Sequence, residues 1–112
     1  MSTEKETKKI NHVFTHDNIM YTLRFNSQKM ETYEGLHNCS FSAVIRANGG
    51  VLPLTHSRTL FVSALVDSKD GTPVEQRRAA EIYEDVLKEK GALTINSMIV
   101  DKVALDCPFL FR

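Results

Sequence analysis

Apolar and polar residues alternate with a period of two through residues 19–25, IMYTLRF. Such a period places every second side chain on one face of a β-strand. Val13 and Phe14 form a shorter arm upstream, and residues 15–18, THDN, supply a turn because Asp and Asn tolerate left-handed backbone conformations. The pattern predicts a β-hairpin over residues 10–25, whose apolar face must pack against helices. The apolar positions of its second strand are Ile19, Tyr21, Leu23 and Phe25.

Beyond the hairpin the apolar residues recur three and four positions apart, which predicts short amphipathic helices. Asn26 or Ser27 can cap the first helix, and Asn38 or Ser40 the second. Thr55 is the expected cap of the third helix. The expected helical segments are approximately 27–36, 40–47, 55–66, 73–90 and 94–106.

The strongest local signal is the segment Thr72-Pro73-Val74-Glu75. A hydroxyl at Thr72 and a carboxylate at Glu75 have the spacing of a capping box, in which each side chain binds the other residue's backbone amide. Pro73 would then stand at the first helical position, where a missing N–H has no consequence. The segment predicts a helix that begins at Pro73 and ends before Gly91.

These elements predict an α+β fold, mostly α, with an N-terminal β-hairpin packed on a bundle of about four to five short helices. Residues 1–9, MSTEKETKK, have no apolar residue after Met1 and are expected to form a disordered tail. The total length of 112 residues fits one domain, which we expect to span residues 10–112.

The charge is balanced, with 14 Lys and Arg against 14 Asp and Glu. A balanced chain lacks the basic surplus that supplies affinity for nucleic acids or anionic membranes, so neither partner is expected. Weak self-repulsion also leaves self-association into higher oligomers open. Cys39 and Cys107 are expected as free thiols in a reducing cytoplasm.

Candidate chemistry is sparse, and we expect no enzyme, cofactor or metal. His37 and Cys39 lie two residues apart, but a structural zinc site needs four ligands with paired spacing. One alternative is an enzyme with a Cys39 nucleophile, because Cys39 precedes a predicted helix start, where a thiolate is stabilised. Another is a helix-turn-helix regulator of DNA, with His56 and Arg58 as base-reading groups. A third is a generic protein-interaction domain.

The chain closes on Phe109, Leu110 and Phe111, which follow the helix-stopping Pro108. These residues either fold back onto the core or form an exposed apolar hook that docks a partner. Val62 and Val66 are further apolar residues expected on the polar face of a helix, where a partner could contact them. The candidate partner-binding residues are therefore Phe109, Leu110, Phe111, Val62 and Val66.

The order of elements resembles the tail assembly chaperones of long-tailed bacteriophages and their prophage relatives. The resemblance lies in the strand and helix of TLRFNSQKMETYEG, the short helix SFSAVIRAN, the helix LTHSRTLFVSALV and the segment TPVEQRRAAEIYEDVLKEKG. In that family the helix that follows the hairpin carries an aromatic or acidic pair, represented here by Tyr33 and Glu34. The resemblance covers roughly residues 12–111.

This resemblance implies a protein without an active site that acts in the bacterial host cytoplasm during virion assembly. Such chaperones coat the tape measure protein, keep its long helical and apolar stretches soluble, and help recruit the major tail (tube) protein. They are then displaced and are absent from the mature virion.

Overall fold

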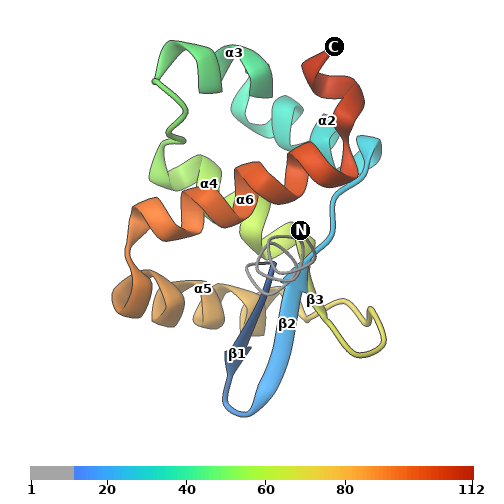
Figure 1. Cartoon of the computed structure of the whole chain (residues 1–112), viewed down its shortest axis with the longest axis vertical. Coiled ribbons are helices and arrows are strands. Elements are labelled where there is room, and N and C mark those ends of the chain that lie inside the picture. Colours follow the sequence, from blue (N-terminus) through green and yellow to red (C-terminus); the bar gives the residue numbers. More distant parts are fainter. Residues whose placement is uncertain (1–11) are drawn as a thin grey trace, which may run out of the picture.

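A computed structural model describes residues 12–112 and shows a small antiparallel sheet packed against five α-helices (Figure 1). The expected α+β, mostly α fold is confirmed. The disordered tail expected over residues 1–9 lies outside the described residues. In chain order the elements are β1 (Val13–His16), β2 (Ile19–Leu23), α2 (Ser27–His37), α3 (Phe41–Ala47), α4 (Leu54–Ala64), β3 (Leu65–Asp67), α5 (Gln76–Lys90), α6 (Ala92–Asp106) and the 3-10 helix η1 (Pro108–Phe111).

The hairpin forms where the alternation predicts it. β1 and β2 pair antiparallel, with Phe14 opposite Tyr21 and His16 opposite Ile19. The two residues between the strands, Asp17 and Asn18, have φ values of 50° and 65°. Positive φ at both positions matches the right-handed twist of the two strands, which is why Asp and Asn suit this turn.

The end of α4 differs from the expected helix. The helix stops at Ala64, and the next three residues form β3, which pairs with β2 through Thr22 opposite Val66. The expectation that Val66 lies on an exposed helical face was therefore wrong, since this side chain is 2% exposed. β2 offers unpaired backbone groups along its second edge, and a β-branched residue such as Val66 fits that position well.

The start of α5 also differs from the expected capping box. The helix begins at Gln76, and the residues before it are extended along β3. The Asp67 amide donates to the Thr72 carbonyl at 2.9 Å, and the Val74 amide donates to the Leu65 carbonyl at 3.1 Å. Pro73 bridges Val66 at this sheet edge, where a residue without an N–H is tolerated. Backbone pairing with the sheet therefore replaces the local cap.

Two predicted helix caps are confirmed. The Asn26 side chain accepts from the Lys29 amide at 2.9 Å at the start of α2, and the Ser40 hydroxyl accepts from the Ala43 amide at 3.4 Å at the start of α3. The other boundaries shift by one or two residues. α4 begins at Leu54, so Thr55 is not its cap, and α6 begins at Ala92.

The core joins the sheet to all five helices, and α6 runs across α4 in Figure 1. Its members with at most 2% exposure include Leu23, Met30, Tyr33, Phe41, Phe61, Ile82 and Ile99. Asn96 of α6 lies at the edge of this core and hydrogen bonds the segment that joins α3 to α4. Its side chain donates to the Gly50 carbonyl and accepts from the Leu52 amide, each at 2.8 Å. Figure 1 places η1 beside α3, at the opposite end of the molecule from the hairpin turn.

Candidate functional site

The C-terminal residues combine features of both expected arrangements. Leu110 packs against the core, whereas Phe109 and Phe111 remain 49% and 47% exposed. The Phe111 ring contacts the fully buried Phe41 edge to face, with 6.2 Å between ring centroids. One residue of the tail thus anchors it, while two aromatic side chains present apolar surface to solvent.

The tail forms one wall of an open groove against α3, which we call the α3–η1 groove. Its volume is about 360 Å³. Ile45, Leu110 and Phe111 supply its apolar surface, and Arg46 and Arg112 supply its charge. The complete lining is Ser42, Ile45, Arg46, Leu110, Phe111 and Arg112.

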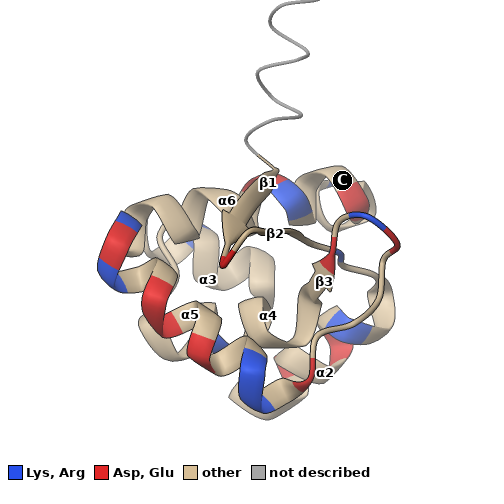
Figure 2. Ribbon diagram, turned by 90° about the horizontal axis from the view of Figure 1, so that it is seen from below, with Lys and Arg blue, Asp and Glu red and all other residues tan. Residues whose placement is uncertain are grey.

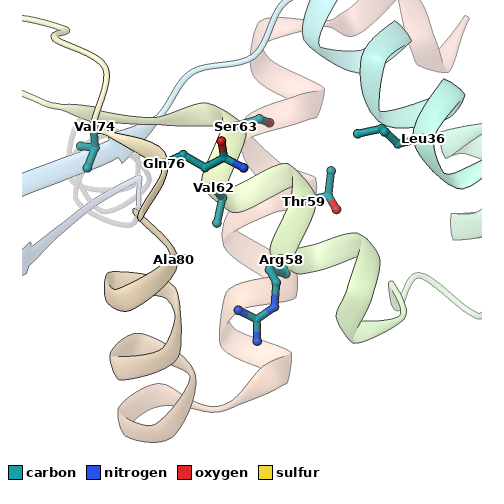
Figure 3. Close-up of a pocket in the computed structure, with 8 residues that line it drawn as sticks. All are labelled: Leu36, Arg58, Thr59, Val62, Ser63, Val74, Gln76 and Ala80. Carbon is teal, nitrogen blue, oxygen red and sulfur yellow. The ribbon is translucent and has the colours of Figure 1, made fainter. Parts of the chain in front are cut away.

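A second open groove, the α2–α4 groove, runs between α2, α4 and the start of α5 (Figure 3). Its volume is about 500 Å³. A smaller pocket of about 300 Å³ extends it along α2 and shares Leu36, Thr59 and Ser63 with it. The larger pocket is lined by Leu36, Arg58, Thr59, Val62, Ser63, Val74, Gln76 and Ala80.

The candidate partner-binding residues do not form a single site. Val62 lies in the α2–α4 groove, Leu110 and Phe111 line the α3–η1 groove, and Val66 is buried in the sheet. Sequence reasoning missed Leu36, which followed the apolar spacing of α2 but is 71% exposed. Only the packing of α4 beside α2 shows that Leu36 borders a groove.

A cluster of aromatic and imidazole rings joins α2 to α4 beside the α2–α4 groove. The Tyr33 hydroxyl hydrogen bonds His56 Nδ1 at 2.8 Å, and His37 Nε2 bonds Thr59 Oγ1 at 2.8 Å. The two imidazole rings lie 4.2 Å apart between centroids. Burial, with a smaller contribution from His37, lowers the pKa of His56, and burial raises the pKa of the Tyr33 hydroxyl. The spacing of Tyr33 and His37 along α2 was visible in the sequence, but the approach of His56 was not.

His37 and His56 lie close together, but the groups considered for chemistry do not assemble into a metal site within the described residues. Among residues 12–112, no group of three or more His, Cys, Asp or Glu side chains could hold a metal ion. Cys39 is a half-buried free thiol between α2 and α3. Cys107 is fully buried, and burial raises the pKa of its thiol.

The two side chains on which the DNA-binding alternative relied are engaged within the chain. His56 bonds Tyr33, and the Arg58 guanidinium pairs with Glu84 and lies 5.0 Å from the centre of the Tyr83 ring. Arg58 and Glu84 connect α4 to α5, whose acidic and basic residues interleave in Figure 2.

Within the described part of the chain, no helix combines the length and apolar character needed to cross a membrane. Comparisons of the chain with protein-family models, with curated proteins and with solved structures find no match.

Proposed function

We propose that this chain is a tail assembly chaperone of a long-tailed bacteriophage or prophage. It binds the tape measure protein in the host cytoplasm, keeps that protein soluble and helps to recruit tail tube subunits. It then leaves the assembling tail. Two properties support this function: the resemblance in element order, and a surface suited to reversible binding of apolar segments.

The observation that supports it best is the apolar surface of the two open grooves. Leu36 is 71% exposed and Phe111 is 47% exposed, each at the wall of a groove rather than inside an enclosed cavity. Apolar side chains that gather at an open groove can serve as a small interaction surface. A chaperone that must later be displaced needs small, partly polar interfaces, and hydroxyl and amide side chains such as Thr59 and Gln76 share the α2–α4 groove.

The test is co-expression of the chain with the tape measure protein from the same locus. We expect the tape measure protein to move into the soluble fraction and to co-purify with the chain. The double variant Leu36→Glu, Phe111→Glu should lose both effects, because a carboxylate in each groove disfavours apolar contact. Leu93→Glu is the matched control, since Leu93 is 69% exposed at the start of α6 and lines neither groove.

Circular dichroism establishes that each variant is folded before it is compared. If the tape measure protein stays insoluble with the wild-type chain, the proposal fails. It also fails if the double variant solubilises the tape measure protein as well as Leu93→Glu does.

A further inference from the structure

We propose that the α3–η1 groove binds an acidic amphipathic helix of a partner protein. An apolar side chain of that helix would enter the groove, and its flanking carboxylates would meet Arg46 and Arg112. This inference deepens the proposed function, on which it rests, by naming the chemistry of the partner segment.

The apolar residues of the groove pack against the hydrophobic core. Phe41 is fully buried beneath the groove, and the Phe111 ring packs on it edge to face. Ile45 and Leu110 are partly buried and pack against the same core. A wall held by core contacts presents its apolar surface without first having to be ordered, which lowers the cost of binding.

The charged side chains that line the groove are all positive. Arg46 and Arg112 are its only charged lining residues, and within the described chain neither forms an ion pair. Two carboxylates of the adjoining helices are engaged elsewhere. Glu34 accepts from the Phe41 amide at 2.7 Å, and Asp106 pairs with Lys102 at 3.2 Å. The groove therefore offers two guanidinium groups, whose planar donors match carboxylates in geometry and in charge.

The shape of the groove favours a protein segment over a small molecule. Small ligands generally bind in clefts that enclose most of their surface, whereas the α3–η1 groove is partly open to solvent. An amphipathic helix can lie across such a groove and bury one apolar face. Carboxylates beside that face complete the match with the two arginines.

The experiment uses a fluorescein-labelled amphipathic peptide of about 20 residues, long enough to form a helix. One face carries Leu and Phe, and Glu residues flank that face. A second peptide keeps the apolar face and has Lys in place of Glu. Fluorescence anisotropy with the full chain should show binding of the Glu peptide about tenfold tighter than the Lys peptide, and the difference should shrink at high salt.

Arg46→Glu should weaken binding of the Glu peptide by about tenfold and bring the two peptides closer in affinity. Arg77→Glu is the matched control, since Arg77 is exposed on α5 outside the groove. This variant changes the net charge by the same amount and should leave the affinity within about twofold.

Equal affinity for the two peptides, or equal effects of Arg46→Glu and Arg77→Glu, overturns the inference. Binding only to phosphatidylglycerol vesicles, or a dimer in sedimentation experiments that Arg46→Glu dissociates, overturns it in favour of a membrane or a second copy. The two proposals fail separately. If the tape measure protein is solubilised equally by wild-type and Arg46→Glu chains, the groove inference fails and the chaperone function stands. If the Glu peptide binds but the tape measure protein is not solubilised, the reverse holds.

Discussion

His56 can accept the hydrogen bond from Tyr33 only while its Nδ1 carries no proton. The hydroxyl of Tyr33 keeps its own proton at neutral pH, because its ordinary pKa is 10.0 and burial raises that pKa further. Thr59 Oγ1 already donates to the Thr55 carbonyl at 3.1 Å, so it accepts from His37 Nε2–H. The groups that face His56 are thus Tyr33 and His37 from α2, and neither offers a negative charge at neutral pH. The contact between α2 and α4 favours neutral His56.

We therefore predict that stability falls as the solution becomes mildly acidic. The pKa of folded His56 lies below its ordinary value of 6.5, so the unfolded chain binds the proton more readily. The stabilisation from neutral His56 is fully present above pH 6.5 and is lost as the pH falls through the lower folded pKa. Urea unfolding at several pH values between about 7.5 and 5 measures the trend. His56→Asn keeps an acceptor near Nδ1 but does not titrate, so its stability should fall less steeply than that of the wild type. Parallel slopes in the two proteins would rule out this role.

At the scale of elements, the sequence predicted best those features that depend on residues close together in the chain. The caps at Asn26 and Ser40 and the hairpin turn at Asp17 and Asn18 depend on local backbone preferences, and each formed where predicted. The failures share a different cause. Val66 lies in the sheet and not in the expected helix. The Thr72 carbonyl accepts from the Asp67 amide, and Thr72 does not cap α5. The pairing of Val66 depends on an edge of β2 that lies more than 40 residues away in the chain, and Thr72 pairs with β3, which forms only at that edge. Local propensity does not register such an edge.

The connection between α3 and α4 should depend on one side chain of α6. Asn96→Ala removes the partners of the Gly50 carbonyl and the Leu52 amide at a site where Asn96 is only 8% exposed. An unsatisfied buried backbone group costs about 1–3 kcal/mol, so we expect the free energy of unfolding to fall by about 2–4 kcal/mol. Urea denaturation measures the change. Asn48→Ala is the control, since exposed Asn48 bonds only within its own helical end, and its loss should cost less than about 0.5 kcal/mol. Comparable losses in the two variants would contradict the bridging role of Asn96.

At the scale of the whole molecule, the sequence identified candidate exposed apolar residues but not which of them lie together in a groove. The aromatic tail was visible because Phe109 and Phe111 follow a helix-stopping proline. The α3–η1 groove was not, since it arises only when η1 lies beside α3, more than 60 residues earlier in the chain. The α2–α4 groove arises in the same way, from Leu36 on α2 and Val74 before α5. A groove built from such separate segments can be predicted only when the packing of the helices is known.

Deleting residues 109–112 should separate the contribution of the tail to stability from its contribution to binding. Leu110 packs on the core while Phe109 and Phe111 remain about half exposed, so the deletion removes limited buried apolar area. We expect a loss of about 2 kcal/mol in the free energy of unfolding, comparable to burying one large apolar side chain. Binding of the Glu peptide should be abolished, because Leu110, Phe111 and Arg112 form one wall of the groove.

Two single variants in the full chain make this comparison decisive. Phe111→Ser removes an aromatic side chain that lines the groove, whereas Phe109→Ser removes one of nearly equal exposure that does not. Anisotropy should show weaker binding of the Glu peptide for Phe111→Ser and unchanged binding for Phe109→Ser. Circular dichroism should show that both variants are folded. If the deletion instead unfolds the chain while Phe111→Ser binds the peptide normally, the tail serves the core alone. The aromatic residues would then be structural, and the partner would have to be sought at the α2–α4 groove.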